Sequence, residues 1–378
     1  MTSKASFDPS ISNFRFLCIF LMTFAHDSFA PSLVNFGAHV PYAATHSPLA
    51  YLNFLLMFGF SRISSPFLGF VSGYFISMNL LERPYVAVIR RRFFSLYVPA
   101  VFWSLAFFAV MIGVGVATSD HAYIHRTYSH LDLGDVFGIG HAPLDQPLHY
   151  LIDLFKCALV APLLILVLRR FGSGIYLFAT ALIFTAFAGV HLGESTPGMS
   201  LAKSLPRADL YLFFSLGILA HRRWKLPIAD TLDKLRIENP LLLSAIALVF
   251  LIATFHWPWL SDMKSDWAMW SGYFTLLIVR VTGSLLLVTL LPWSRWLAER
   301  GLVVDDRLTF TLFCTHTISY FVLDGMIGWG FRAEIYGIVA FYLAPFLATG
   351  AAFAILWAQN LATGLLVRVP YVVRRISE

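Results

Sequence analysis

Long apolar stretches recur along the whole chain, and they constrain the fold more than any other feature of the sequence. A helix needs about 20 apolar residues to cross a hydrocarbon layer about 30 Å thick. About ten stretches approach this length, and polar segments separate them. They cover roughly residues 12–31, 50–80, 93–117, 148–168, 174–191, 209–221, 240–256, 269–291, 308–325 and 334–358. The sequence therefore predicts an all-α integral membrane protein with about ten transmembrane helices.

The composition agrees with this prediction. Hydrophobic residues make up 58% of the chain and charged residues 13%, whereas about 25% of a soluble protein is charged. So little polar surface cannot coat a water-soluble domain, and disordered regulators need low hydrophobicity. The three cysteines, Cys18, Cys157 and Cys314, lie inside apolar stretches, which predicts neither a disulfide framework nor a zinc cluster.

The net charge of +6 raises the question of a nucleic-acid partner, and the distribution of the basic residues answers it. With a cytoplasmic N-terminus, most of the 27 Lys and Arg residues fall on the cytoplasmic side of the ten spans. This is the asymmetry of the positive-inside rule. We therefore expect both termini in the cytoplasm, a retained first helix, one membrane domain over residues 1–378 with spans roughly over 12–358, and no nucleic acid.

The second stretch, residues 50–80, is too long for one straight span. It contains Arg62, Pro66 and the dipeptide Ser72-Gly73, and proline is a common cause of a helix kink. We expect a bend or break here. Ser72 and Gly73 would allow close backbone approach at such a break, because glycine lacks a side chain. Amide groups freed there would be able to stabilise an oxyanion.

The longest outer segment, roughly residues 118–147, carries several histidines: His121, His125, His130 and His141. They fit a metal or sugar site, or a polar loop that happens to contain imidazoles. Their spacing matches no metal-ligand motif, so we favour the polar loop and predict no bound metal.

Ionisable side chains inside a bilayer cost free energy and usually face a protein interior or a water-filled cavity. Arg15 and His26 are three helical turns apart, so an α-helix would present both on nearly one face, separated by about 16 Å. Such a helix holds a cation near the cytoplasmic mouth and a titratable base deeper in the membrane, which suits an anionic donor. The alternative is an arginine that reaches the interface and a histidine with a structural hydrogen bond.

Other ionisable residues inside the stretches have less specific interpretations. Asp153 and Lys156 are three residues apart and can neutralise each other. Arg280 lies in the middle of its stretch, and His316 is either a polar lining residue or a core histidine.

Five segments carry motifs in a fixed order along the chain: Arg15-x10-His26, Arg62 to Pro66 with Ser72-Gly73-Tyr74, Arg90-Arg91-Arg92 before Pro99 and Trp103, Leu148 to Leu151 with Pro162, and Phe313 to His316. Together they resemble the acyltransferase 3 family of membrane acyltransferases, over essentially the whole chain. Two departures concern the subgroup: His149 stands in place of a common tryptophan, and Ser95 in place of the second arginine of an Arg-x-x-Arg pair.

The resemblance implies transfer of an acyl group, most often acetyl from acetyl-CoA, onto a hydroxyl of a surface or secreted glycan. The acyl-CoA is then a co-substrate and no cofactor is bound. Partners would be the donor, a glycan or lipid-linked sugar acceptor, and membrane lipid. The setting would be the inner membrane of a bacterium.

The resemblance also implies roles for individual residues. His26 would be the general base or a covalent relay for the acyl group, and Arg15 would bind the phosphates of CoA. Arg62 and Arg92 would add to this clamp, although the cluster around Arg92 also satisfies the topology. The remaining candidates would line the cavity: Ser72, Gly73, Tyr74, His316 and Arg280.

Two other classes of protein fit the same residues. A secondary transporter or flippase for a lipid-linked sugar would also contain many spans and buried charge, although no internal repeat is visible. A non-catalytic membrane scaffold would tolerate changes at Arg15 and His26. Within the acyltransferase interpretation, the donor would be acetyl-CoA or succinyl-CoA, and the sequence does not distinguish between these two donors.

Overall fold

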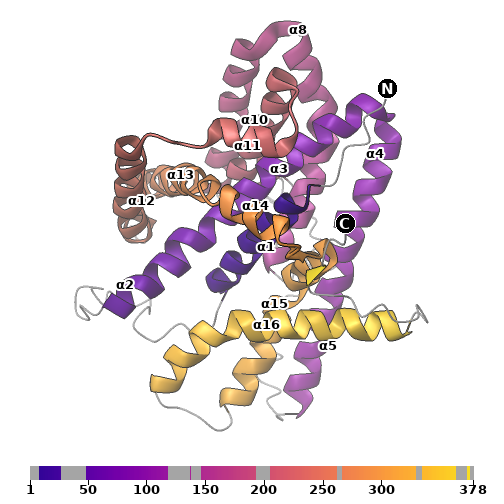
Figure 1. Ribbon diagram of the computed structural model, residues 1–378, viewed down its shortest axis with the longest axis vertical. Coiled ribbons are helices and arrows are strands. Elements are labelled where there is room, and N and C mark those ends of the chain that lie inside the picture. Colours follow the sequence, from indigo (N-terminus) through magenta and orange to yellow (C-terminus); the bar gives the residue numbers. More distant parts are fainter. Residues whose placement is uncertain are drawn as a thin grey trace. The chain divides into compact units, whose positions relative to one another are not determined.

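The computed structural model describes residues 8–26, 48–117, 137, 146–192, 205–261, 266–328, 334–362 and 373–374, and nearly all of them are helical (Figure 1). The chain forms two compact units. The first unit comprises Met1–Ser64 and Leu232–Glu378, and the second unit comprises Ser65–Thr231. The second unit is therefore an insertion in the sequence of the first. Whether the two act as the one membrane domain expected over residues 1–378 stays a prediction.

The first unit contains both ends of the chain. Its helix α1 begins where Asp8 caps the first turn, because the carboxylate accepts a hydrogen bond of 2.9 Å from the backbone N–H of Ser10, and Pro9 is well suited to a first turn. The elements are α1 (Pro9–Thr23), η1 (Phe24–His26), α2 (Pro48–Phe54), η4 (Leu55–Phe60), α12 (Pro240–Ser261), α13 (Asp266–Val288), α14 (Leu291–Glu299), β1 (Val303–Val304), α15 (Asp306–Gly328), α16 (Glu334–Ala362) and β2 (Val373–Arg374).

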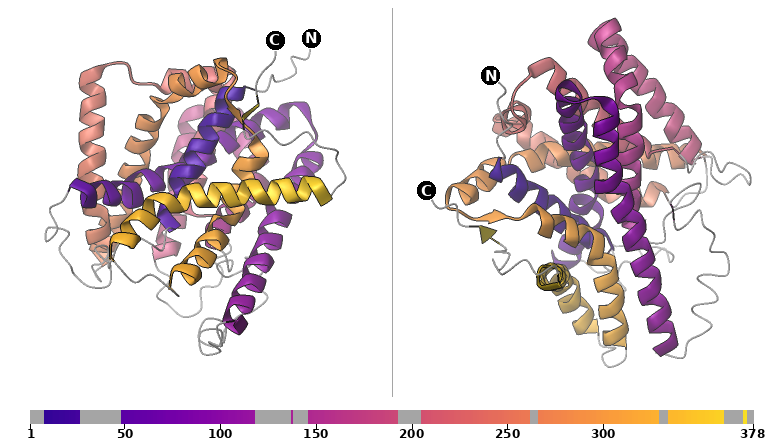
Figure 2. Two further views of the ribbon diagram at one scale, coloured as in Figure 1. Left: turned by 60° about the horizontal axis from the view of Figure 1, so that its bottom comes forward. Right: turned by 90° about the vertical axis from the view of Figure 1, so that its right-hand side faces the viewer.

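Every secondary-structure element described in the second unit is a helix. Figure 2 shows α4, η5 and α5 as one long continuous helix. Helix α8 bends at Gly172, whose φ of 79° lies in the region that favours glycine. The elements are α3 (Ser61–Glu82, which starts in the first unit), α4 (Tyr85–Arg92), η5 (Phe93–Tyr97), α5 (Val98–Ala117), η6 (Gln146–Leu148), α8 (His149–Leu192), α10 (Ala208–Trp224) and α11 (Ile228–Leu235, which ends in the first unit).

The helices coincide with the predicted apolar stretches, and the all-α membrane fold is confirmed to that extent. Among the described residues, five helices are long and apolar enough to cross a membrane, or six if α11 and α12 form one bent span. The α8 helix contains two predicted stretches, one on each side of Gly172. Large apolar side chains such as Phe178 and Leu241 remain exposed, as lipid-facing residues would. The count of ten and the cytoplasmic termini stay predictions.

The break expected at Ser72-Gly73 is wrong. Helix α3 continues through this dipeptide and also through Pro66, so its backbone amides stay in helical hydrogen bonds and the oxyanion site has no basis. The irregularity lies earlier, in the π-helical segment η4.

Gly73 instead allows two helices to cross closely within the second unit. A Cβ atom added to Gly73 of α3 would lie 1.9 Å from the carbonyl oxygen of Phe214 in α10. The contact is reciprocal, because a Cβ added to Gly217 of α10 would lie 2.0 Å from the carbonyl oxygen of Phe70 in α3. Small residues commonly permit such backbone approach between membrane helices.

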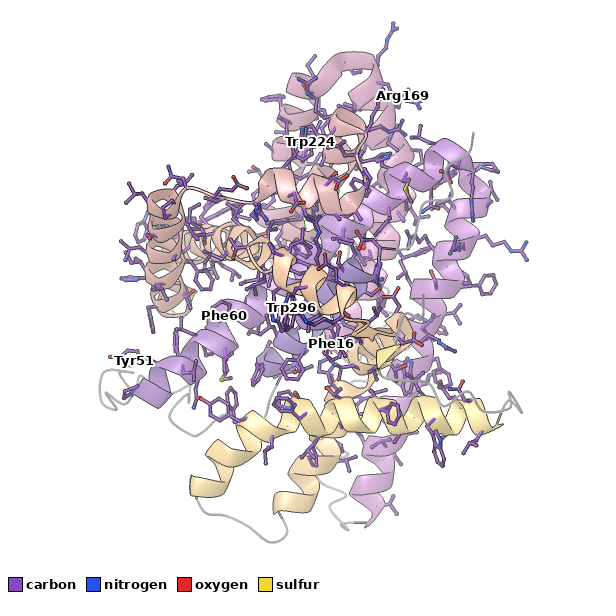
Figure 3. All side chains as sticks on the ribbon, viewed as in Figure 1. Phe16, Tyr51, Phe60, Arg169, Trp224 and Trp296 are labelled. Carbon is purple, nitrogen blue, oxygen red and sulfur yellow. The ribbon has the colours of Figure 1, made fainter. Side chains whose placement is uncertain are left out.

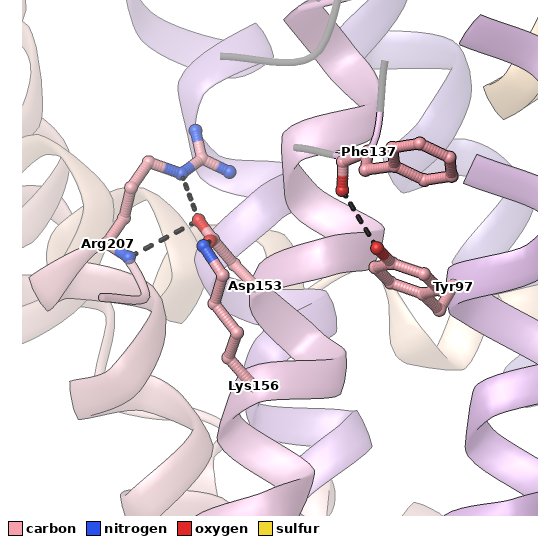
Figure 4. A network of polar contacts seen from close by, with 5 residues as sticks. All are labelled: Tyr97, Phe137, Asp153, Lys156 and Arg207. Atoms are coloured by element: carbon pink, nitrogen blue, oxygen red, sulfur yellow. Dashed lines mark hydrogen bonds and ion pairs between the residues drawn. The ribbon is translucent and has the colours of Figure 1, made fainter. Parts of the chain in front are cut away.

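A charge network around the buried carboxylate of Asp153 also holds the second unit together (Figure 4). The side chain of Asp153 is 2% exposed and accepts hydrogen bonds from Lys156 Nζ at 3.3 Å and Arg207 Nε at 3.1 Å. The backbone N–H of Arg207 donates a third, at 3.3 Å. The predicted neutralisation of Asp153 by Lys156 is confirmed, and Arg207 adds a second cation.

The first unit ties α1 to the segment before α15 through Asn13. Its Nδ2 donates to the carbonyl of Leu302 at 2.7 Å, and its Oδ1 accepts from the N–H of Val304 at 2.8 Å. Strand β1, which contains Val304, pairs antiparallel with β2 near the end of the chain. One short strand therefore binds both the first helix and the last described residues.

Candidate functional site

Helices α1 and α15 of the first unit meet at two points, and each point involves a predicted site residue. Arg15 Nη1 donates to Asp306 Oδ1 at 3.1 Å, and both side chains are about one-third exposed. Further along both helices, the ring centroids of His26 and His316 are 5.5 Å apart. Because Arg15 precedes His26 and Asp306 precedes His316, the two helices run in the same direction. The site is therefore a cation paired with a carboxylate at one end and two imidazoles at the other.

His26 lies beyond the end of α1, in the 3₁₀ turn η1. The sequence expectation of one continuous α-helix through His26 is therefore wrong by its last three residues, although Arg15 and His26 still both face α15. The turn is held by Phe24, which is buried against Phe341 of α16 with ring centroids 5.4 Å apart. The imidazole of His26 is half-buried.

His316 is fully buried, and its hydrogen bonds define its tautomer. Nδ1 lies 2.8 Å from the carbonyl oxygen of Phe313 and 3.2 Å from that of Leu312. A carbonyl only accepts hydrogen bonds, so Nδ1 carries the proton and Nε2 of the neutral ring carries a lone pair. Nε2 is buried and has no hydrogen-bond partner among the described residues. It can act as an acceptor or a base.

The π-helical segment η4 packs next to the two histidines' end of the site. It contacts η1 with His26, and it also contacts α1, α12 and α13. Figure 3 marks Tyr51 in α2 and Phe60 at the end of η4. Gly59 fits against α12, because an added Cβ would lie 3.0 Å from the ring of Phe250. Single π-helical turns inside helices are frequent at functional sites.

Arg62 and Arg280 come from two helices that touch in the first unit. A Cβ added to Gly283 of α13 would lie 2.5 Å from the side chain of Ile63. Arg62 is the neighbour of Ile63, and Arg280 lies about one helical turn before Gly283. Both arginines are half-buried, and the Nε atom of each is buried. Three of the predicted arginines, Arg15, Arg62 and Arg280, therefore belong to the same unit as His26 and His316.

The other predicted residues lie in the second unit. Ser72 is half-buried and Gly73 packs against α10. Tyr74 is buried, with its hydroxyl donating to the carbonyl of Leu226 and its ring in a T-shaped contact with His221 at 4.9 Å. The contacts of Gly73 and Tyr74 are thus packing contacts within the second unit. That Ser72, Gly73 and Tyr74 line a cavity stays a prediction.

Arg92 ends helix α4 and is half-buried. It belongs to the second unit, whereas Arg15 and Arg62 belong to the first. Its part in binding the donor of His26 therefore stays a prediction.

Sequence reasoning missed Asp306. The search for ionisable residues was confined to the apolar stretches, and Asp306 lies just before the stretch 308–325. An acidic residue in the first turn of a helix is also common for a local reason, because it complements the helix dipole. The available signal was only that Asp306 precedes His316 by about the distance that separates Arg15 from His26.

Metal binding has no support in the described part of the chain, where no three His, Cys, Asp or Glu side chains could hold an ion together. The histidines of the segment 118–147 lie outside the described residues. The expectation of no metal accordingly stays a prediction.

Comparison with known proteins places the chain in a family. A family model described as an acyltransferase domain matches residues 8–359, which include every predicted site residue. The succinoglycan biosynthesis protein ExoH of Rhizobium meliloti (strain 1021) is 27% identical over 324 residues, covering 82% of this chain and 80% of that protein. No solved structure matches significantly. The chain thus belongs to the acyltransferase 3 family.

Proposed function

We propose that the protein transfers an acyl group from acyl-CoA, in the first instance acetyl-CoA, onto a hydroxyl of a polysaccharide or its lipid-linked precursor. The setting proposed is the inner membrane of a bacterium, with the donor entering from the cytoplasm. The observation that carries this proposal is the pairing of α1 with α15, which holds Arg15 and His26 in one site. Family membership and the relative in succinoglycan biosynthesis support a polysaccharide acceptor.

In this proposal His26 acts as the general base. It takes the proton from the acceptor hydroxyl while the oxygen attacks the thioester carbonyl. The new C–O bond forms, the C–S bond breaks, and the CoA thiolate takes the proton back from His26, so that His26 returns to its starting state. An imidazole suits both transfers because it titrates near neutral pH.

Arg15 would bind the phosphates of the donor. Its side chain is 36% exposed, and one of its N–H groups is bound to Asp306. A guanidinium carries five N–H donors in a rigid fork, so the pair with Asp306 leaves other donors for a phosphate. Arg62 and Arg280 would add positive charge in the same unit, and Arg92 would add it from the second unit.

The acyl group proposed is acetyl, with succinyl as the alternative donor. The secondary transporter or flippase for a lipid-linked sugar has no specific observation in its favour, whereas the matched family is one of acyltransferases.

The proposal is tested with membranes that contain the protein, isotopically labelled acetyl-CoA or succinyl-CoA, and glycans extracted from the producing cells. We expect label on a glycan with one donor and at least a 100-fold slower transfer by His26→Ala, since a general base contributes about 10²–10⁴-fold. His256→Ala is the matched control, because it removes an exposed imidazole from the same unit. Unchanged transfer by His26→Ala, or no label with either donor, would contradict the proposal.

A further inference from the structure

The Nε2 atom of His316 is a buried acceptor that the structure leaves without a hydrogen bond from any described residue. Leaving a buried polar atom unpaired costs free energy, because the atom gives up its hydrogen bond to water and gains none in return. The ring cannot rotate to relieve this cost without losing the bonds from Nδ1 to the carbonyls of Phe313 and Leu312. The lone pair on Nε2 is therefore fixed in place and needs a donor.

His26 is the polar neighbour at the right distance. A hydrogen bond of about 3 Å between two ring nitrogens places the imidazole centroids roughly 5 Å apart, and the observed separation is 5.5 Å. The rings are inclined by 52°, and the hydrogen bond forms when the half-buried ring of His26 directs an N–H at Nε2. The ring of Tyr320 makes a T-shaped contact with the imidazole of His316, with ring centroids 6.0 Å apart. This contact further restrains the ring of His316.

We infer that His316 is a positioning residue, which accepts a hydrogen bond from the imidazole of His26 and thereby fixes its tautomer and orientation. This inference rests on the proposed role of His26 as general base. With one nitrogen of His26 donating to His316, the other nitrogen must carry the lone pair that receives the hydroxyl proton. When His26 becomes protonated, the same hydrogen bond stabilises the imidazolium. Orientation of a base by a third group is a general arrangement in acyl transfer.

The inference gives α15 a larger part in the site. It supplies Asp306, which holds Arg15, and His316, which orients His26. Arg15 of α1 and His26 of η1, which the proposed function requires, are therefore both held by α15.

The test compares two replacements of His316. Glutamine keeps a polar group near the position of Nε2, whereas phenylalanine has a similar size and no acceptor. We expect His316→Phe to lower kcat about 100-fold with little change in the KM for the donor, and His316→Gln to recover most of that loss. A merely structural role would lower thermal stability and yield while leaving kcat of the folded protein unchanged.

A second measurement does not depend on transfer activity. Diethyl pyrocarbonate acylates the free nitrogen of an imidazole, and mass spectrometry quantifies the reaction at His26. We expect His316→Phe to slow modification of His26 several-fold in folded protein, because the tautomer and orientation of His26 are no longer fixed.

The outcomes separate the two proposals. Full activity and an unchanged modification rate in His316→Phe, or equal losses in the Gln and Phe variants, would overturn the positioning role and leave the proposed function standing if His26→Ala is inactive. Full activity of His26→Ala would overturn the proposed function itself.

Discussion

The two units differ in what joins their helices. In the second unit, α3 and α10 touch backbone to backbone at Gly73 and Gly217, and the buried carboxylate of Asp153, which is 2% exposed, binds two cations. In the first unit, α1 and α15 are joined by side chains, and those side chains include a partly exposed ion pair and two histidines. Backbone contacts at glycine cannot rearrange without moving a whole helix, so they suit a rigid support. Ionisable side chains, in contrast, are able to change their hydrogen-bond partners during a reaction. The difference agrees with our proposal that the chemistry belongs to the first unit.

The largest effect is expected from a methyl group added at the α3–α10 crossing. Gly73→Ala and Gly217→Ala place a Cβ about 2 Å from a backbone oxygen, which no side-chain rotation relieves. We expect a loss of stability above about 3 kcal/mol, measured as a loss of folded protein in detergent.

Two matched alanine substitutions sharpen this contrast. Gly113→Ala in α5 adds a methyl group to open space and should raise stability by up to about 1 kcal/mol. Gly59→Ala in the first unit meets only the side chains of Phe250 and Thr254, which are able to shift, so its effect should be smaller than that of Gly73→Ala. Equal losses at Gly59 and Gly73 would remove this difference between the units.

An intermediate effect is expected from Asp153→Asn. This substitution leaves Lys156 and Arg207 without their shared carboxylate. The loss should be about 1–3 kcal/mol, less than for a fully buried pair, because Arg207 is 38% exposed and its charge remains in contact with water. Lys156→Gln should cost less, because Arg207 still pairs with Asp153. Thermal unfolding in detergent measures both variants, and a larger loss for Lys156→Gln would show that the network is not centred on Asp153.

The smallest effect on stability is expected from Asp306→Asn in the first unit. The Arg15–Asp306 pair is partly exposed, and such pairs contribute about 0–1 kcal/mol. We nevertheless expect the KM for acyl-CoA to rise several-fold, because Arg15 loses the carboxylate that positions it for the donor. The control is Asp305→Asn, since Asp305 pairs with the exposed Arg307. An unchanged KM in Asp306→Asn would separate the ion pair from donor binding.

The sequence predicts those features that depend on local pattern. The apolar stretches predicted helices because membrane crossing demands length and hydrophobicity, and Arg15 and His26 were conspicuous because charge inside such stretches is costly. Asp153 and Lys156 were paired correctly because three residues separate them on one helix. In each case, the physical constraint acts within about twenty residues.

Features that depend on distant partners were not predicted. The carboxylate that binds Arg15 is 291 residues away, and it lies outside any apolar stretch. Ser72-Gly73 suggested a break because small residues favour both breaks and close helix crossings, and only the position of Phe214 decides between them. The tautomer of His316 depends on backbone carbonyls that the sequence shows only as an ordinary helix.

Because the second unit is inserted between the two parts of the first, the order of synthesis matters. The ribosome makes α1 early, but the residues that complete the site, Asp306 and His316, follow 291 and 290 positions later. At about 5–20 residues per second, this interval is roughly 15 seconds to one minute. Throughout that time Arg15 and His26 are in the nascent chain without α15, while the second unit can already fold. The site therefore assembles only after the whole second unit has been synthesised, and a chain interrupted before α15 would lack both Asp306 and His316.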